Sequence, residues 1–303
     1  MSLYHKYRPT SFEQVRGNED LISSLQTLLS KPDPPHVYLL HGAYGCGKTT
    51  IARIIAEQLQ CVGNDIKELD SGQFRGIDTI REIRANSGYK PLEGENRCWI
   101  LDEAQKLTSD AQSALLKILE DTPSNVYFII CTTEPQKILD TIKSRSIQLQ
   151  VKTLNDETLT SLLRKVVRSE GETLQKEVYE QIVQDSLGHP RNALNILEQV
   201  LSSHVESRLN VAKKSAENQS QSIELCRVLL RGAKWKEISI ILKGLQDQQP
   251  EDVRRHVLGY CQAVLLKEDN IRCGLIMEMM LPSVYYSGWP GLTYAVYSIV
   301  KGE

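Results

Sequence analysis

The sequence lacks the features that would place the chain in a membrane or outside the cell. It has no run of about 18 apolar residues, so we expect no membrane-spanning helix. Residues 1–9 contain no apolar signal region and read as the start of a mature protein. The seven cysteines are odd in number and form no C-x-x-C pair. That pattern favours reduced, buried thiols in a cytoplasmic protein over a disulfide framework or a zinc site.

A large excess of charge of either sign is also missing. The chain has 36 Lys and Arg against 38 Asp and Glu, a formal net charge of −2. This balance argues against a generally basic protein, although a local patch for nucleic acid can exist within a neutral total. A hydrophobic fraction of 41% excludes a disordered chain. At about 150 residues per domain, 303 residues indicate two domains, or three small ones.

The first half of the chain alternates strand-like and helix-like segments. Continuous apolar runs over 36–41, 97–102 and 126–131 are typical of strands buried on both faces of a parallel sheet. Helical patterns cover 51–59 and 109–120 between these runs, and only helical patterns follow residue 152. We therefore predict an α/β domain over 1–152, a small helical domain over 153–205 and a helical C-terminal domain over 206–303.

A glycine-rich turn directly follows the first apolar run. Its residues, Gly42-Ala43-Tyr44-Gly45-Cys46-Gly47-Lys48-Thr49, match G-x-x-x-x-G-K-S/T, and Thr50 continues into a helical pattern. Glycines let backbone N–H groups wrap a phosphate, and the helix N-terminus adds positive potential. We expect Lys48 to reach the β- and γ-phosphates of a nucleotide and Thr49 to ligate Mg²⁺. A chance glycine-rich turn is the alternative, which the strand before it and the helix after it disfavour.

Two carboxylates follow the second apolar run. Asp102 would hold the magnesium ion directly or through water, and Glu103 would polarise the attacking water as a general base. Two acids at a strand end are a weak signal alone, because a solvated strand end has the same composition. The glycine-rich turn upstream makes the pair a strong candidate for nucleotide hydrolysis.

With these motifs in place, the chain resembles the AAA+ clamp-loader ATPases over about residues 3–200. Tyr7-Arg8-Pro9 resembles the family's opening motif, and Asp102-Glu103-Ala104-Gln105 resembles its acidic box, which ends in His or Asp. Further resemblances cover 114–123, 132–138, 144–146 and 188–194. The nearest resemblance is to the bacterial DNA polymerase III gamma/tau subunit and to replication factor C small subunits. It implies an α/β AAA+ P-loop NTPase domain with a parallel sheet, then a helical lid and an all-α collar.

The resemblance also implies ligands and residue roles. It implies ATP and Mg²⁺, and the residues on the adenine side would be Tyr4, Arg8 and Val15. Thr133 would be sensor 1, Arg191 would be sensor 2, and Arg145 would be the arginine finger for a neighbouring subunit's ATP. A supplied guanidinium stabilises charge that spreads over the γ-phosphoryl oxygens. Taken singly, either arginine would read as an ordinary surface or ion-paired side chain.

Four departures from the family pattern are visible. Ser146 stands for the usual cysteine, and Asn192 stands for an aspartate. Bacterial relatives carry a four-cysteine zinc insertion about where this chain has a short connection from Gln60 to Leu69 with Cys61 alone, so we expect no zinc. With a length of 303 residues, we expect no long polymerase-binding tail. We expect a compact subunit of phage or otherwise minimal type, in a bacterial or phage-infected cytoplasm.

Two segments are candidates for contact with DNA. Residues 73–78 resemble a replication factor C segment that tracks the DNA backbone, with Arg75, Gly76 and Ile77 at the expected start of a helix. Lys106 and Thr108, before the helix over 109–120, are the second candidate. Such contacts suit sequence-independent reading of the backbone. Ordinary solvated surface is the alternative for both segments.

Our main hypothesis is an ATPase subunit of a DNA sliding-clamp loader. ATP binding would assemble a spiral that opens the clamp and grips primer-template DNA, and hydrolysis would release it. The implied partners are the clamp, primer-template DNA and other loader subunits, including several copies of this chain, with no membrane. One alternative is another DNA-associated AAA+ motor, such as a branch-migration helicase. The other is a structural subunit that does not hydrolyse ATP, which the intact motifs disfavour.

Overall fold

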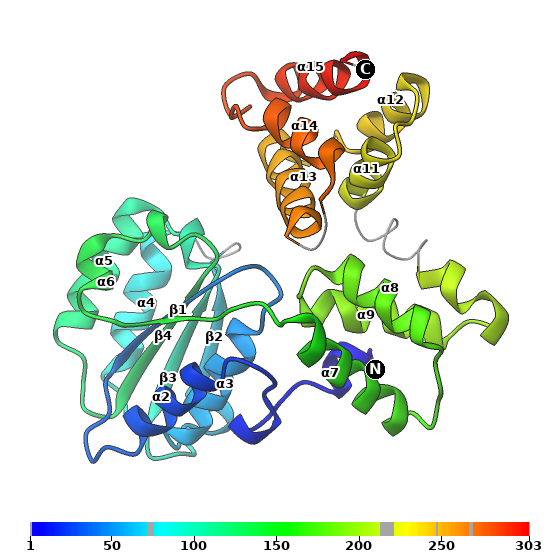
Figure 1. The fold of residues 1–303 in the computed structure, drawn as a ribbon. Coiled ribbons are helices and arrows are strands. Elements are labelled where there is room, and N and C mark those ends of the chain that lie inside the picture. Colours follow the sequence, from blue (N-terminus) through cyan, green and yellow to red (C-terminus); the bar gives the residue numbers. More distant parts are fainter. Residues whose placement is uncertain (1, 72–75, 213–220, 247, 267–268, 303) are drawn as a thin grey trace. The chain divides into compact units, whose positions relative to one another are not determined.

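The computed structural model describes residues 2–71, 76–212, 221–246, 248–266 and 269–302, and Figure 1 presents the fold. The chain divides into two compact units. Residues 1–166 and 188–194 form the first, here called the α/β unit; residues 167–187 and 195–303 form the second, the helical unit. The finer three-domain division given above remains a proposal.

A five-stranded parallel sheet forms the centre of the α/β unit. Its strands are β1 (Val37–His41), β2 (Ile66–Asp70), β3 (Arg97–Asp102), β4 (Val126–Thr132) and β5 (Ile147–Gln150). Their order in the sheet is β2-β3-β4-β1-β5, and every neighbouring pair is parallel. The carboxyl ends of all five strands therefore lie at one edge of the sheet, where parallel α/β proteins hold their ligands.

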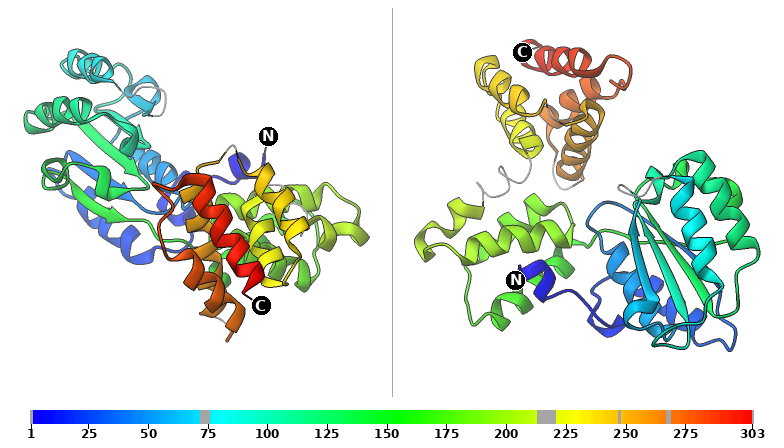
Figure 2. Two further views of the ribbon diagram at one scale, coloured as in Figure 1. Left: turned by 90° about the horizontal axis from the view of Figure 1, so that it is seen from above. Right: turned by 180° about the vertical axis from the view of Figure 1, so that it is seen from behind.

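Helices cover both faces of this sheet, as Figures 1 and 2 show. On one face, α2 (Glu19–Leu29) and α3 (Lys48–Gln58) pack against strand residues such as Tyr38 and Leu40. On the other, α4 (Ile77–Ser87), α5 (Ser109–Glu120) and α6 (Asp140–Lys143) pack against Val37 and Leu39. Successive strand residues point to opposite faces, so continuous apolar runs serve both cores. The predicted α/β class with a parallel sheet is confirmed.

One short helix, three longer helices and several single turns, divided between the two units, make up the other elements before residue 208. The helices are α1 (Leu3–Lys6), α7 (Asp156–Ser169), α8 (Lys176–Ser186) and α9 (Pro190–Leu201). Single 3₁₀ turns occur at Phe12–Gln14, Gly63–Asp65, Ala104–Lys106, Pro135–Lys137 and Val205–Ser207. The helix predicted over 51–59 begins at Lys48, and the helix predicted over 109–120 has those bounds.

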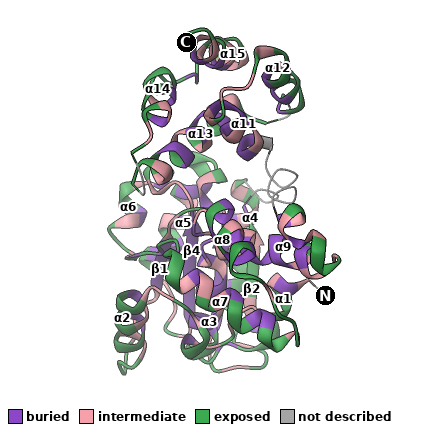
Figure 3. Cartoon of the chain, turned by 45° about the vertical axis from the view of Figure 1, so that its right-hand side comes forward, coloured by how far each residue is buried: buried purple, intermediate pink, exposed green. Residues whose placement is uncertain are grey.

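Five further helices share one apolar core in the helical unit. They are α11 (Gln221–Leu230), α12 (Trp235–Gly244), α13 (Pro250–Leu265), α14 (Ile271–Met280) and α15 (Gly288–Lys301). Their buried faces, purple in Figure 3, meet around residues such as Leu225, Val257 and Ile276. No helix among the described residues is long and apolar enough to cross a membrane.

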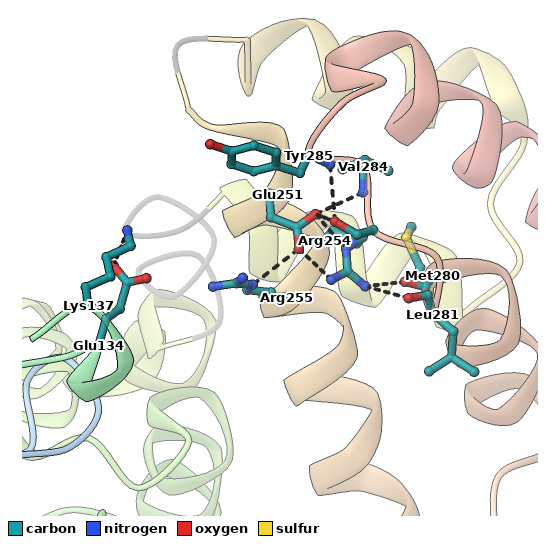
Figure 4. Close-up of polar contacts among 10 residues, drawn as sticks. Glu134, Lys137, Glu251, Arg254, Arg255, Met280, Leu281, Val284 and Tyr285 are labelled. Carbon is teal, nitrogen blue, oxygen red and sulfur yellow. Dashed lines mark hydrogen bonds and ion pairs between the residues drawn. The ribbon is translucent and has the colours of Figure 1, made fainter. Parts of the chain in front are cut away.

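A charged cluster fixes the start of α13 to the end of α14 (Figure 4). The Glu251 carboxylate accepts hydrogen bonds from the Arg254 guanidinium at 2.6 and 2.9 Å and from the backbone N–H of Val284 at 2.9 Å. Arg254 also donates to the backbone carbonyl of Met280 at 2.6 Å. Carbonyls at a helix C-terminus lack helical partners, so this guanidinium satisfies one of them.

All seven cysteines are buried free thiols, as the sequence predicts. Burial raises the pKa of Cys98 and Cys131 well above the usual value, so both stay protonated. The described part of the chain has no group of three or more His, Cys, Asp or Glu side chains placed to hold a metal ion. The absence of zinc stays a prediction.

Candidate nucleotide-binding site

The glycine-rich loop over 42–49 joins the carboxyl end of β1 to the start of α3. Gly47 caps α3 with φ +106°, a left-handed conformation that side chains disfavour. A Cβ added to Gly42 would lie 2.1 Å from the carbonyl oxygen of Val151, so only glycine fits there. A Cβ at Gly47 would meet nothing within 4 Å, which leaves open space beside the α3 N-terminus. Exposed backbone N–H groups at such an end bind phosphate oxygens.

Lys48 lies within this loop. Lys48 is only 6% exposed, and its Nζ donates hydrogen bonds to the backbone carbonyls of Gly42 at 3.0 Å and Ala43 at 2.9 Å. A buried ammonium group needs such partners because desolvation penalises its charge. Cys46 is also buried, and burial raises the pKa of its thiol, so the loop carries no reactive thiolate.

Thr49 and Asp102 meet at the candidate metal position. The Thr49 hydroxyl donates to Asp102 Oδ2 at 2.7 Å, and the backbone N–H of Glu103 donates to Asp102 Oδ1 at 3.0 Å. A hydroxyl and a carboxylate beside a phosphate loop are the donor set that Mg²⁺ shares with nucleotide phosphates. The two residues therefore fit the ion that the sequence motifs imply.

A glutamine to which we assigned no role from sequence connects Glu103 to Thr133. Gln105 Nε2 donates to Glu103 Oε2 at 2.7 Å and to Thr133 Oγ1 at 2.9 Å. Glu103 itself has φ +53°, which is uncommon for a residue other than glycine. The predicted base and the predicted sensor 1, which follow β3 and β4, are thus joined by one side chain.

Arg191 is held by two tyrosines. Its guanidinium carbon lies 4.5 Å from the ring centre of Tyr4 and 5.1 Å from that of Tyr44. Its nitrogens donate to the Tyr4 hydroxyl at 2.6 Å and to the Tyr44 hydroxyl at 2.8 Å. Although burial opposes the charge, these contacts raise the pKa of Arg191. Burial lowers the pKa of the neighbouring His189, which favours its neutral form.

These groups surround one cavity of about 600 Å³ in the α/β unit. The lining includes most of the predicted site residues: Tyr4, Arg8, Val15, Tyr44, Gly45, Cys46, Gly47, Lys48, Thr49, Thr50, Asp102, Glu103 and Arg191. Gly42, Ala43 and Thr133 do not line it, although Lys48 contacts the first two and Gln105 contacts the third. Glu68 and Asp70 also line it, and our sequence analysis missed them because it did not predict β2.

Arg145, the predicted arginine finger, does not line this cavity. It follows α6, and its Nη2 is 2.7 Å from Glu120 Oε1 at the end of α5. About two fifths of its side chain is exposed, at 39%. The role of Arg145 as an arginine finger therefore stays a prediction.

Of the residues expected to contact DNA, three lie at the starts of two helices: Gly76, Ile77 and Thr108. Arg75 lies outside the described residues. Gly76 caps α4 and Ile77 is its first residue, whereas the Thr108 hydroxyl caps α5 by accepting from Ala111 N at 3.2 Å. Lys106 instead lines the nucleotide cavity, with its Nζ 3.6 Å from Glu103 Oε2.

A groove between α4 and α5 connects the two helix starts. Its lining residues are Ile77, Ile80, Arg81, Arg84, Asp110, Ser113, Ala114 and Lys117. Its three cations, Arg81, Arg84 and Lys117, lie beside one acid, Asp110, and Arg81 pairs with Asp78 at 2.8 Å. The remaining excess of positive charge and the helix N-termini suit an anionic partner.

Known proteins resemble both the sequence and the fold. A family model described as DNA polymerase III, delta subunit, matches residues 64–155. The gamma/tau subunit of DNA polymerase III from Mycobacterium tuberculosis is 34% identical over 236 residues, which are 70% of this chain and 41% of that protein. The gamma subunit from Buchnera aphidicola is 30% identical over 66% of this chain and 61% of its own length. The tau subunit from Escherichia coli is 27% identical over 80% of this chain and 44% of its own.

Solved structures resemble the fold at lower identity. The RuvB Holliday junction branch migration motor of Thermotoga maritima is 20% identical, with a TM-score of 0.60 over 74% of this chain and 79% of that one. This likeness establishes the fold alone. The chain spans less than two thirds of the length of the polymerase III subunits that it matches. The sequence similarity to the DNA polymerase III subunits supports a clamp-loader subunit of the AAA+ type.

Proposed function

We propose that the chain is an ATP-hydrolysing subunit of a DNA sliding-clamp loader. The observation that carries the proposal is the convergence of Lys48, the Thr49–Asp102 pair and Arg191 on one cavity. The names of the polymerase III relatives favour clamp loading over other uses of ATP. We keep the division into an AAA+ domain over 1–152, a lid over 153–205 and a collar over 206–303 as part of this proposal.

Several residues of the cavity have a part in phosphoryl transfer. The loop N–H groups and the α3 N-terminus hold the phosphates, and Lys48 neutralises their charge. Thr49 and Asp102 would hold Mg²⁺, which would supply further positive charge beside the phosphate oxygens. Glu103 orients the attacking water and accepts its proton, while Arg191 stabilises charge on the γ-phosphoryl group. Tyr4, Arg8 and Val15 line the end that would receive the base.

The assembled loader supplies the parts that a single chain lacks. Arg145 reaches the ATP of a neighbouring subunit after leaving Glu120, so hydrolysis depends on assembly. In the resulting spiral, the α4–α5 groove of each copy contributes weak backbone contacts to primer-template DNA. Several copies multiply these contacts, and binding weakens steeply with salt. ATP binding orders this spiral around an opened clamp, and hydrolysis releases the clamp on DNA.

The decisive experiment measures ATP turnover of the assembled loader with and without clamp and primer-template DNA. We expect stimulation only when both are present, and no stimulation would overturn the clamp-loader proposal. Stimulation by branched DNA without a clamp would support a branch-migration motor instead. The measurement with branched DNA is included because the fold is similar to that of RuvB.

A pair of variants tests whether the chain hydrolyses ATP or is only structural. Lys48→Ala should lose ATP binding, whereas Arg145→Ala should bind ATP but not turn it over. If the finger acts between chains, mixing the two inactive variants should restore turnover. Turnover should return at interfaces where a Lys48→Ala copy supplies Arg145 to an Arg145→Ala copy that holds ATP, roughly a quarter of all interfaces at equal amounts. Full turnover by either variant alone would contradict these roles.

A further inference from the structure

The amide of Gln105 makes hydrogen bonds in both of its directions. Besides donating to Glu103 and Thr133, its Oε1 accepts from the Thr132 hydroxyl at 2.8 Å and from the backbone N–H of Thr133 at 3.3 Å. A backbone N–H can only donate and a carboxylate can only accept. The orientation of the amide is therefore fixed by its partners, with Oε1 toward β4 and Nε2 toward Glu103.

These bonds set the position of the proposed base. Gln105 Nε2 and Lys106 Nζ both face Glu103 Oε2, at 2.7 and 3.6 Å. Among the described residues, Glu103 Oε1 has no hydrogen-bond partner, and Glu103 lines the nucleotide cavity. One carboxylate oxygen is thus anchored, which leaves the other available to water.

The same amide sets the direction of the Thr133 hydroxyl. Because Thr133 Oγ1 accepts a hydrogen bond from Gln105, its own O–H must donate elsewhere. Thr132 cannot take the place of Thr133 in this arrangement, since its hydroxyl already donates to Gln105 and accepts from the backbone N–H of Glu134 at 3.1 Å. A threonine hydroxyl that is free to donate can bind a phosphate oxygen.

We propose that Gln105 is a positioning residue for ATP hydrolysis. It holds the Glu103 carboxylate and the Thr133 hydroxyl in one fixed relation across the ends of β3 and β4. A change at the hydroxyl, such as contact with a γ-phosphate, therefore moves the carboxylate through a single rigid amide. The inference rests on the proposed ATPase function and adds the group that couples sensor 1 to the base.

Two variants separate positioning from folding. Gln105→Ala removes all four hydrogen bonds, whereas Gln105→Glu keeps the shape and both acceptor bonds but loses both donors. We expect either change to lower kcat by about 10- to 100-fold, with the Kd for ATP changed less than about threefold. Gln181→Ala is the matched control, because Gln181 Nε2 also donates to a carboxylate, that of Asp185, at 2.7 Å and lines no part of the cavity. This control should retain the wild-type kcat.

A double-mutant cycle provides the readout that a structural role would not move. Thr133→Val removes the hydroxyl at nearly constant volume. If Gln105 acts through Thr133, the double variant with Gln105→Ala should be about as slow as the slower single variant. Multiplying effects, or an unchanged kcat in Gln105→Glu, would overturn the inference. A wild-type chain that neither binds nor hydrolyses ATP in the assembled loader would instead overturn the proposed function.

Discussion

Arg191 is prepared for its proposed role by side chains from distant parts of the sequence. Tyr4 precedes the sheet, Tyr44 belongs to the phosphate loop, and Arg191 follows the start of α9. A guanidinium against aromatic faces gains about 0.5–2 kcal/mol per contact, depending on how far it is desolvated. Both hydroxyls also accept from it, so the arginine is confined before any phosphate arrives. Confinement lowers the entropy cost of binding.

Tyr44 provides a test of this confinement. Removing its ring in Tyr44→Ala should free one side of Arg191, so ATP should bind about 3- to 10-fold more weakly. Tyr44→Phe keeps the ring and loses only the hydroxyl bond, so its effect should be smaller. Equilibrium binding of ATP to the full chain checks both values. Tighter binding by Tyr44→Ala would contradict the idea, because it would mean that the tyrosine competes with the nucleotide.

At the scale of single residues, the sequence predicts which side chains belong to the site better than it predicts which side chains they contact. Lys48, Thr49 and Asp102 lie in motifs with fixed spacing, and the structure brings them to one cavity. Gln105 ends the acidic box, but the motif gives it no role, because a glutamine after two acids has many possible partners. Its role depends on β3 and β4 being neighbours, which is a property of the sheet order.

Among the elements, the connection before β2 is fixed by a buried carboxylate. Asp65 is fully buried and accepts from the backbone N–H groups of Leu92, Glu93 and Gly94 at 2.7 to 2.9 Å. The buried Arg97 guanidinium lies 3.5 Å away. Although burial opposes the charge, these donors lower the pKa of Asp65 to about 2. One side chain thus joins the α3–β2 and α4–β3 connections.

Asp65→Asn should destabilise the chain by roughly 3 kcal/mol. The change keeps the shape but removes the charge that balances Arg97, and it places an amide N–H₂ among N–H donors. Urea unfolding should report the loss, and hydrogen exchange should accelerate at 92–94. The control is Asp78→Asn, because Asp78 pairs with Arg81 at 2.8 Å on an exposed surface. Such exposed pairs contribute about 0–1 kcal/mol. Equal losses of stability in the two variants would refute the idea that the buried Asp65 contacts stabilise the chain more than an exposed ion pair does.

The two strands that the sequence pattern missed are those at the edges of the sheet. β5 reads Ile-Gln-Leu-Gln and alternates apolar and polar residues over only four positions. β2 reads Ile-Lys-Glu-Leu-Asp and has apolar residues only at its first and fourth positions, so neither strand forms a continuous apolar run. An edge strand needs less apolar surface because it has one neighbour instead of two. The three central strands are continuous apolar runs and were predictable for that reason.

At the scale of the molecule, the described part of each compact unit contains a carboxylate whose pKa is lowered to about 2. Asp65 is in the α/β unit and Glu251 is in the helical unit. Hydrogen bonds from Arg254, from the Val284 backbone and from Ser283 lower the pKa of Glu251 to about 2 against the opposing effect of burial. Unfolded carboxyl groups titrate near about pH 4, so between about pH 4 and pH 2 the unfolded chain binds more protons. Stability must therefore fall as pH falls through this window.

Glu251→Gln tests the share of the helical unit in this acid sensitivity. At pH 7 the variant should melt at a lower temperature, because Arg254 and the Val284 N–H lose a charged acceptor. Between pH 5 and pH 3 its Tm should fall less steeply than that of the wild type, since the contribution that acid removes is already gone. Glu237→Gln, which breaks an exposed pair with Arg231 in the same unit, should leave the slope unchanged. Parallel Tm curves for Glu251→Gln and the wild type would mean that the lowered pKa of Glu251 does not contribute to stability.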